Sequence, residues 1–335
     1  MYTMPHTYVQ QKMAQIIPEF RSLGGKSFHE WQISARAKLT ELLCLPLESC
    51  DSDILIEFER DHDDFHEVRF SVHTEPSFRV PCHLLIPRGA DRPLPVAICL
   101  QGHSKGMYVS LGREKYDTDE PAVHDDSDFC IRAVKEGFCA IAIEQRGFGE
   151  LGGTENGPAC ANPAMTALLI GRTIIGERVW DVMRLVDALA ALPFPQVDRS
   201  KVILMGNSGG GTTAFFTSCL DERIKYVMTS SYFCTFDDSI AAMRHCVCNY
   251  VPGIRKYFDM GDMAGMIAPR PLVIDSGRDD TIYPLHGVKK AYAIAQEKYA
   301  QAGAPENMAS VVGDGGHRFY ADLAWLAMKQ YIGVS

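Results

Sequence analysis

The stretch KVILMGNSGGGTTAFF, residues Lys201–Phe216, decides the fold. It runs from a continuous apolar segment through glycines that surround one serine, Ser208, into residues compatible with a helix. A strand that turns sharply into a helix needs small residues at the turn, because the two backbones approach closely there. The new helix would direct N–H groups and the positive end of its dipole toward the serine. The stretch therefore predicts Ser208 at the apex of a strand-turn-helix, either as a nucleophile or merely as a helix cap.

The rest of the chain repeats this alternation of strand and helix. Short apolar runs recur from Pro95 onward: PVAICLQG, FCAIAIEQRG, KVILMGNS, IKYVMTSS, RPLVIDSG and NMASVVGDGG. Amphipathic segments such as GERVWDVMRLVDALAAL lie between them. Strands that are apolar on both faces are typical of a parallel sheet covered by helices on both sides. The pattern predicts an α/β protein with a doubly wound, mostly parallel sheet.

Three segments depart from the alternation. Residues 1–50 carry apolar side chains near helical spacing, which predicts an N-terminal helical extension. The runs DILIEFER, FHEVRFSVH and FRVPCHLLIPRG alternate apolar and polar residues, as an antiparallel meander with one solvated face does. Residues 234–268 interrupt the pattern beyond the carboxyl end of a strand, where open sheets place ligands. We expect a main domain over 51–335 with a helical cap or pocket wall at about 234–268.

The composition of the chain indicates which partners and which cell compartment are to be expected. The 335 residues carry a net charge of −9 and no cluster of Lys and Arg, which argues against nucleic-acid binding. No basic segment precedes an apolar run near the start, and no eighteen apolar residues are consecutive, so neither an export signal nor a membrane span is expected. Eleven cysteines, an odd number scattered through apolar segments, favour a reducing cytoplasm. Assembly into a homo-oligomer is left open.

A serine nucleophile needs an imidazole that takes its proton and a carboxylate that orients the imidazole. In a sheet of this kind these groups follow the serine in the order acid, then histidine, on loops after later strands. The strand PLVID is followed by SGRDDTIYP with Asp279 and Asp280, and the strand MASVVG by DGGHRFY with His317. The order and the positions at strand ends therefore predict that Ser208 is activated.

Of the candidate acids, Asp280 is preferred because GRDDTIYP fits the pattern Gly-x-x-Asp-x-apolar-x-Pro that is frequent in hydrolases. Asp279 would then face solvent or form a turn. Asp275, inside the strand, and Asp314, before the histidine loop, are weaker candidates. His286 comes too early in the chain order to replace the base.

Acyl transfer also requires donors for a tetrahedral oxyanion. We expect the backbone amide of Gly209 to be one donor. The second would be the amide of His103, in the loop CLQGHSKGM after the first parallel strand, where Gly102 permits close approach. The imidazole of His103 would then only shape the pocket.

Two clusters in the sequence contain residue types that bind metals. Cys246 and Cys248 form a C-x-C pair, but no second Cys or His pair stands at zinc-finger spacing. The acidic segment RDHDDFH holds His62 and His66, and a solvated hairpin turn explains it better. The sequence therefore predicts no metal site.

With these residues in hand, the chain resembles the α/β-hydrolases, and more narrowly the bacterial acetyl-xylan-esterase-like branch related to dienelactone hydrolases. The resemblance spans about Phe70 to the C-terminus and rests on MGNSGGGTT, LLIGRTIIGERVWDVMRLVDAL, CNYVPG and MAGMIAPRPLVIDSGRDDTIYP. It implies the α/β-hydrolase fold and hydrolysis of a short acyl ester, acetyl on a carbohydrate or small molecule, through Ser208, His317 and Asp280. No metal or organic cofactor is implied.

The chain departs from that family at two places. QGH stands where family members have His-Gly-aromatic, and EQRG, residues 144–147, stands where they have Asp-x-Arg-Gly. Arg146 would either clamp a substrate or, as the favoured alternative, bind the cap and neighbouring loops. The segment MRHCVCNYVPG is expected to fold over the serine, which adds Cys246 and Tyr250 to Gly102 and Arg146 as candidate pocket residues.

Two other functions stay open at this stage. A serine peptidase or a thioesterase could use the same fold, although about ninety residues before the parallel strands are too few for the propeller domain that peptidases of this fold often carry. A catalytically silent binding protein would need a broken triad. The residues here are in register, which argues against it.

Overall fold

One nine-stranded sheet organises the protein, whose computed structural model describes residues 3–119 and 126–334. The spatial order of the strands is β1-β2-β3-β5-β4-β6-β7-β8-β9. From β5 to β9 along this order all neighbours are parallel, and β1, β2 and β3 form an antiparallel meander at one edge. The strands are β1 Ile54–Asp61, β2 Phe65–Glu75, β3 Phe78–Pro87, β4 Leu94–Leu100, β5 Cys139–Ile143, β6 Val197–Asn207, β7 Ile224–Ser230, β8 Leu272–Gly277 and β9 Met308–Gly313.

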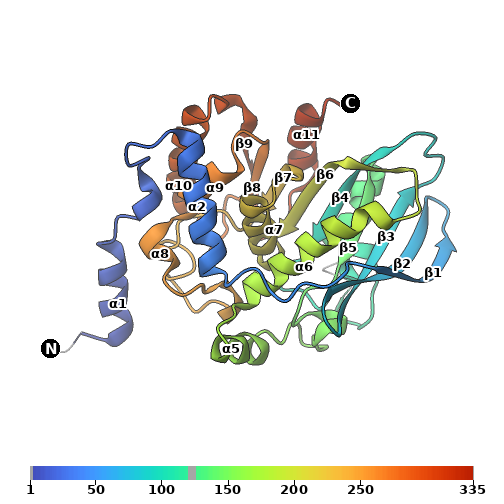
Figure 1. Ribbon diagram of the computed structural model, residues 1–335, viewed down its shortest axis with the longest axis horizontal. Helices are drawn as coiled ribbons and strands as arrows, with labels where there is room; N and C mark the ends of the chain where they lie inside the picture. The colour runs from blue at the N-terminus through green and yellow to red at the C-terminus, as the bar shows by residue number, and fades with distance from the viewer. Residues whose placement is uncertain (1–2, 120–125, 335) are drawn as a thin grey trace.

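Helices cover both faces of the sheet (Figure 1). On one face lie α4 Phe129–Lys135 and α11 Ala321–Ile332; on the other lie α6 Ile174–Ala188, α7 Gly209–Leu220 and α10 Leu285–Gln301. Outside α7 and α10 pack α2 Phe28–Leu42 and α9 Met260–Ile267. Further α-helices in the described residues are α1 Pro5–Ala14, α5 Ala161–Leu169 and α8 Ile254–Tyr257. The doubly wound α/β fold predicted from the sequence is confirmed.

The apolar strands have two separate cores because successive side chains point to opposite faces. In β4, Val96 and Ile98 join the core under α6 and α7, while Ala97 and Cys99 join the core under α4 and α11. A strand buried in this way has no polar position, which is why the central strands read as continuous apolar runs.

The meander differs from its expectation in one respect. Only β1 is largely exposed, with Ile54 and Ile56 half-buried, whereas most of β2 and β3 is buried. The reason is that α6 packs against β2 and α4 packs against β3, so both of these strands are covered. The acidic segment after β1 is the hairpin turn that joins it to β2, as predicted.

The first fifty residues behave as two different parts. Helix α1 buries none of its side chains and lies at the periphery of the molecule (Figure 1). Helix α2 starts with a capping box between Ser27 and Glu30 and buries Trp31 and Leu39. Residues 234–268, expected to be a cap, contain the short helix η6 Val247–Asn249 together with α8 and α9.

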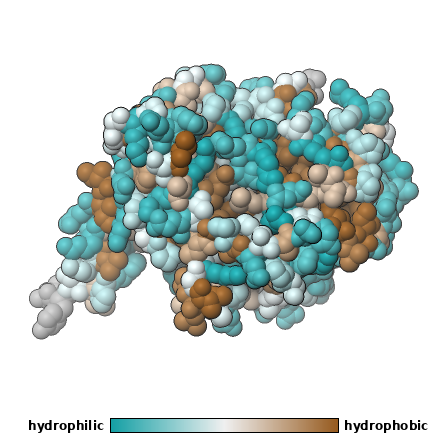
Figure 2. All heavy atoms as spheres, in the orientation of Figure 1, coloured by the Kyte–Doolittle hydropathy of each residue, from teal (hydrophilic) through white to brown (hydrophobic). Residues whose placement is uncertain are grey.

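The outer surface carries an apolar patch at α5. Figure 2 shows brown side chains gathered there, at the lower edge of the molecule. The exposed apolar residues of this helix and its end are Met165, Leu168, Leu169 and Ile170. Within residues 3–119 and 126–334, no helix combines the length and apolar character that crossing a membrane requires.

Candidate active site

The turn between β6 and α7 holds Ser208 in a strained conformation. Its φ of 52° and ψ of −117° lie in a region that ordinary residues rarely occupy. The glycines around it are required by contact: a Cβ on Gly206 would lie 2.3 Å from the carbonyl oxygen of Gly210, and one on Gly210 would lie 2.0 Å from that of Leu100. The backbone N–H of Ser208 donates to the carbonyl of Ser230 at 2.9 Å. The tight strand-turn-helix expected from the sequence is present.

His317 and Asp280 form a hydrogen-bonded pair beside this turn. His317 follows β9, Asp280 follows β8, and His317 Nδ1 lies 2.8 Å from Asp280 Oδ2. Asp280 Oδ1 accepts the backbone N–H groups of Ile282 at 2.8 Å and Tyr283 at 3.0 Å. The Tyr283 ring stacks on the His317 imidazole at 5.8 Å between centroids. These contacts fix both the carboxylate and the plane of the ring.

The competing residues have other positions. Asp279 and Asp314 are exposed. Asp275 is fully buried and accepts the Ser230 hydroxyl at 2.6 Å, and burial raises the pKa of its carboxyl to about 6. His286 is exposed and lies 3.2 Å from Asp238. The structure therefore pairs His317 with Asp280 among these acids.

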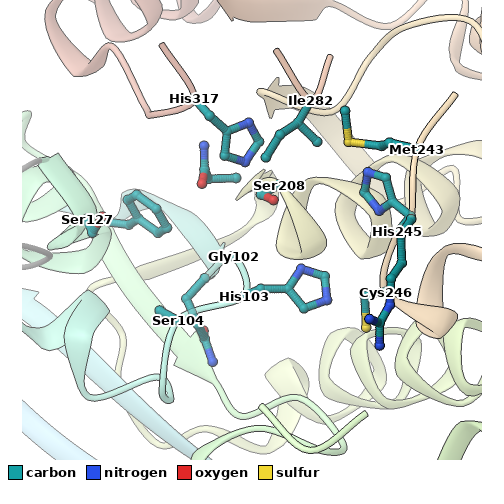
Figure 3. Close-up of a pocket in the computed structure, with 14 residues that line it drawn as sticks. Gly102, His103, Ser104, Ser127, Ser208, Met243, His245, Cys246, Ile282 and His317 are labelled. Atoms are coloured by element: carbon teal, nitrogen blue, oxygen red, sulfur yellow. The ribbon is translucent and has the colours of Figure 1, made fainter. Parts of the chain in front are cut away.

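A cavity of about 510 Å³ opens at the carboxyl ends of β4, β6, β8 and β9 (Figure 3). Of the residues expected from the sequence, it brings Gly102, His103, Ser208, Cys246 and His317 together. Within the described part of the chain, Ser208 Oγ makes no hydrogen bond, either to His317 or to another residue. The hydrogen bond between a catalytic serine and its histidine often forms only when substrate binds. The other lining residues are Gln101, Ser104, Ser127, Phe129, Asn207, Met243, Arg244, His245 and Ile282.

The two expected oxyanion donors are neighbours. Gly209 opens α7, so its N–H has no partner within the helix. Among the described residues, the N–H of His103 donates to no protein acceptor. A Cβ on Gly209 would lie 2.6 Å from the imidazole of His103, and one on Gly102 would lie 3.2 Å from the Ser208 Cβ. The loop after β4 therefore packs directly on the serine turn.

Glu144, which follows β5, braces the loop after β4. Its Oε1 accepts the Gln101 side chain at 2.8 Å and the Met107 N–H at 3.1 Å, and its Oε2 accepts the Glu150 N–H at 3.1 Å. Burial outweighs these hydrogen bonds and raises the pKa of the carboxyl to about 7. Sequence reasoning noted this residue only as a departure from the family, because its partners are remote in sequence.

Arg146 and Tyr250 do not line the cavity. Arg146 Nε donates to Asp181 at 2.8 Å, and one Nη donates to Glu75 at 2.7 Å. These partners lie on α6 and at the end of β2, so Arg146 contacts neither the cavity nor residues 234–268 through these bonds. Tyr250 is partly exposed, and its hydroxyl donates to the carbonyl of Ile240 at 3.1 Å.

His245 is a cavity residue that the sequence did not reveal. Thr212 Oγ1 donates to Asn249 Oδ1 at 2.8 Å, so the Asn249 amide nitrogen faces His245 Nδ1 at 3.0 Å. The ring therefore carries its proton on Nε2, which has no protein partner in the described residues. Burial lowers the pKa of His245 to about 4, so this imidazole is neutral at pH 7.

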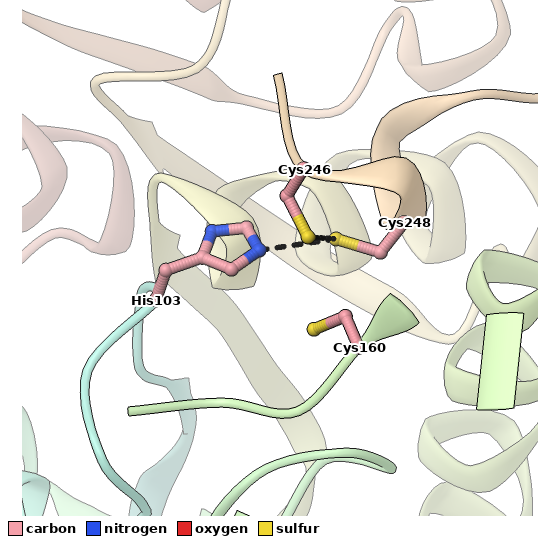
Figure 4. Close-up of side chains that lie close together, drawn as sticks. All are labelled: His103, Cys160, Cys246 and Cys248. Atoms are coloured by element: carbon pink, nitrogen blue, oxygen red, sulfur yellow. Dashed lines mark hydrogen bonds between the residues drawn. The ribbon is translucent and has the colours of Figure 1, made fainter. Parts of the chain in front are cut away.

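Next to the cavity, one histidine and three cysteines converge (Figure 4). His103 Nε2 and the Sγ atoms of Cys160, Cys246 and Cys248 all lie within 4.8 Å of one another. The sequence indicated only the C-x-C pair. His103 and Cys160 escaped notice because they come from segments far from that pair.

Comparison with known proteins gives the family. A family model described as "Abhydrolase family" matches residues 2–310. YtaP of Bacillus subtilis (strain 168), a protein classed as a hydrolase, is 28% identical over 245 residues, which are 71% of this chain and 78% of YtaP.

Solved structures share the fold at low sequence identity. A protein of Bacteroides fragilis NCTC 9343 classed as an acetyl xylan esterase has a TM-score of 0.75 at 16% identity, with 97% of this chain and 84% of that chain covered. A glucuronoyl esterase of carbohydrate esterase family 15 from Teredinibacter turnerae T7901 has a TM-score of 0.69 at 16% identity, covering 97% and 89%. The expectation of a hydrolytic enzyme with the α/β-hydrolase fold is thus confirmed, and this chain belongs to the abhydrolase family.

Proposed function

We propose that the chain is a serine carboxylester hydrolase that removes short acyl groups, acetyl in particular, from a carbohydrate or small-molecule ester. The observation that carries this proposal is the Asp280–His317 pair, 2.8 Å apart, which shares one cavity with Ser208 on its strained turn. A serine, a base and an oriented carboxylate are the groups that acyl transfer to serine requires.

In the proposed reaction, Ser208 attacks the ester carbonyl while His317 accepts its proton through Nε2. Asp280 holds the Nδ1–H of His317 and stabilises the imidazolium that forms. The N–H groups of His103 and Gly209 receive the oxyanion. His317 then protonates the leaving alcohol, and a water molecule repeats the sequence on the acyl-enzyme.

The substrate class is supported by the cavity and by the relatives. A volume of about 510 Å³ suits a small molecule or one or two sugar units rather than a protein chain. His245, whose Nδ1 faces the Asn249 amide nitrogen, offers its Nε2–H as a donor to a hydroxyl or carbonyl of the substrate. Proteins with this fold include those named as acetyl xylan and glucuronoyl esterases, which act on carbohydrate esters by those names.

The test is Ser208→Ala, with Ser218→Ala as the matched control on the same helix. Ser218 is fully buried on α7 and belongs to no part of the proposed machinery. We expect Ser208→Ala to lose about 10⁴-fold or more of p-nitrophenyl acetate turnover with an unchanged melting temperature. The control should keep its turnover. Near-wild-type activity of Ser208→Ala would disprove the proposal.

A substrate panel separates the alternatives on the same fold. The panel compares p-nitrophenyl esters of increasing length, acyl thioesters and amino-acyl anilides, together with acetate release from acetylated xylan, acetylated monosaccharides and cephalosporin-type esters. Higher kcat/KM on anilides would indicate a peptidase, and on thioesters a thioesterase. Failure of a fluorophosphonate probe to label the wild type would indicate a silent binding protein.

We also propose that the enzyme works in the cytoplasm. All eleven cysteines are unpaired, including pairs of thiols close enough to oxidise in an oxidising compartment. Fractionation of the producing cell tests this: activity in the extracellular or periplasmic fraction would contradict it.

A further inference from the structure

We propose that His103, Cys160, Cys246 and Cys248 bind one Zn²⁺ ion in a closed, tetrahedral site beside the catalytic cavity. This proposal does not depend on the esterase proposal, because its evidence and its test concern metal binding alone. It differs from the expectation drawn from cysteine spacing, since two of the four ligands come from segments that spacing does not connect.

The positions of the ligand atoms suit such an ion. Tetrahedral Zn²⁺ with Zn–S bonds of about 2.3 Å and a Zn–N bond of about 2.1 Å places its ligand atoms about 3.5–3.8 Å apart. In the structure all four atoms lie within 4.8 Å of one another, with Cys246 Sγ and Cys248 Sγ at 3.3 Å and His103 Nε2 and Cys248 Sγ at 3.0 Å. Shifts of a few tenths of an ångström to about one ångström would complete the tetrahedron.

A buried arginine supplies an independent observation. Arg178 on α6 is 1% exposed, and no carboxylate pairs with it among the described residues. Its Nη2 lies 3.2 Å from Cys160 Sγ, its Nε and Nη2 donate to the carbonyl of Arg146, and its Nη1 has no partner. The ring of Phe148 lies 4.6 Å from the guanidinium. A fully buried cation without an anion is costly.

Zinc binding would supply the negative charge that balances the buried guanidinium of Arg178. Three neutral thiols give Arg178 no counter-charge, and three bare thiolates would repel one another. One Zn²⁺ with three thiolates and a neutral imidazole carries a net charge of −1, which balances Arg178 in contact with Cys160. The site and the arginine together are then neutral.

The four ligand atoms indicate which metal ion would bind and whether it would be structural or catalytic. Three thiolates and one imidazole in a tetrahedron favour Zn²⁺ over the hard cations Mg²⁺ and Ca²⁺, which prefer oxygen ligands. Four protein ligands leave no open position for water, which is the mark of a structural rather than a catalytic ion. His103 and Cys246 line the cavity, so the ion has an entry path from solvent.

The ion would join three segments that are far apart in the sequence. His103 follows β4, Cys160 precedes α5, Cys246 precedes η6 and Cys248 lies within it. The imidazole of His103 also lies against Gly209. Binding at Nε2 would therefore hold the loop that presents the His103 amide without entering the reaction.

The first measurement is the metal content of the full-length wild type. The protein is purified under reducing conditions without metal-affinity resin, equilibrated with Zn²⁺ and desalted. We expect about one zinc per chain by inductively coupled plasma mass spectrometry. Replacement by Co²⁺ should give the intense visible bands of a tetrahedral site and thiolate-to-metal charge transfer. Less than a tenth of an ion per chain, or an octahedral Co²⁺ spectrum, overturns the proposal.

The second measurement locates the ion. Cys160→Ser and Cys248→Ser should each lower the retained zinc at least tenfold, while the matched controls Cys99→Ser, buried in the sheet, and Cys50→Ser, half-buried, should keep it. Circular dichroism verifies that each variant is folded. Unchanged zinc in both ligand variants, or a Cys160–Cys246 disulfide in wild type purified without reductant, refutes the site. Because these readouts are independent of turnover, a failure of the esterase proposal would leave them unaffected.

Discussion

Asp279 and Asp280 are adjacent and chemically identical, yet the backbone after β8 gives them different surroundings. The N–H of Asp279 donates to the carbonyl of Gly315, and its side chain is exposed. Asp280 is 4% exposed and turns its carboxylate toward His317. The position in the loop, which differs by one residue, therefore decides which carboxylate reaches the imidazole.

We predict that Asp280→Asn lowers kcat/KM for p-nitrophenyl acetate by about 10³–10⁴-fold. The asparagine oxygen can still accept the N–H groups of Ile282 and Tyr283, which leaves its amide nitrogen facing His317 Nδ1 and favours the wrong tautomer. Asp279→Asn should stay within about twofold of wild type, as exposed substitutions usually do. The opposite ranking would reassign the acid.

The sequence could predict Ser208, Asp280 and His317 as candidates because each stands at a strand end in a fixed chain order. His245 and Glu144 could not be found in this way. Their roles depend on the Asn249 amide and the Met107 N–H, which the fold brings to them from separate loops. Chain order carries no information on such contacts.

At the scale of elements, Asp275 ties several strand ends together. Its Oδ2 accepts the Ser230 hydroxyl at 2.6 Å and the Tyr320 N–H at 3.1 Å, while the Asn207 side chain donates to Ser230 Oγ at 3.0 Å. Asn207 ends β6, Ser230 ends β7, Asp275 lies within β8 and Tyr320 precedes α11. The buried Oδ1 of Asp275 has no partner. The carboxylate therefore connects the serine turn to the histidine loop at an electrostatic cost.

We predict a pH-dependent stability that follows from this cost. The pKa of Asp275 in the folded protein, about 6, is above its ordinary value of 3.8, so the native state holds the proton more tightly. Its contribution is complete below pH 4 and is lost as the pH rises toward 6, by about 2–3 kcal/mol. In Asp275→Asn, where the amide oxygen keeps both hydrogen bonds, that decline should disappear. Urea denaturation from pH 4.5 to 7.5 measures it; parallel curves for the two proteins would exclude this origin.

The strands of the parallel sheet were predictable because burial on both faces removes every polar position from them. The burial of β2 and β3 was not, since the alternation in their sequences is also that of half-solvated strands. Arg69 and Glu67 in β2 are buried as partners in ion pairs, Glu67 with Arg113 at 2.6 Å and Arg69 with Glu150 at 2.8 Å. In the sequence, buried polar residues that form ion pairs cannot be told from the polar residues of a strand face exposed to solvent.

At the scale of the whole molecule, the two helices of the N-terminal region differ in burial: α1 buries no side chain, whereas α2 packs into the core. Helix α1 contacts the body through few groups, such as Gln10, whose side chain donates to the carbonyl of Ala241 at 2.7 Å. Trp31 of α2 is 1% exposed, donates to the carbonyl of Phe20 and lies against Gly265 of α9. The N-terminal extension expected over residues 1–50 therefore contains two helices, and we expect α2 to contribute more to stability than α1.

We predict that Trp31→Ala lowers the free energy of unfolding by about 3–5 kcal/mol, because it opens a cavity between α2 and α9. Deletion of residues 1–15 should change it by less than about 1 kcal/mol, since α1 buries no side chain. Guanidinium denaturation of the two variants beside wild type compares them. A larger loss for the deletion than for Trp31→Ala would show that α1 is an integral element.

The convergence of His103, Cys160, Cys246 and Cys248 has a consequence for the order of events during synthesis. Cys248 is the last of the four in a chain of 335 residues, so about three quarters of the chain must be synthesised before all four side chains can meet. The parallel strands β4, β5, β6 and β7 precede the last two cysteines in the chain. Cys160 is therefore synthesised long before Cys246 and Cys248, and its thiol has to stay unreacted until they emerge if the cluster is to form. Completion of the cluster would therefore come after β4 to β7 have been synthesised and before β8 and β9 have.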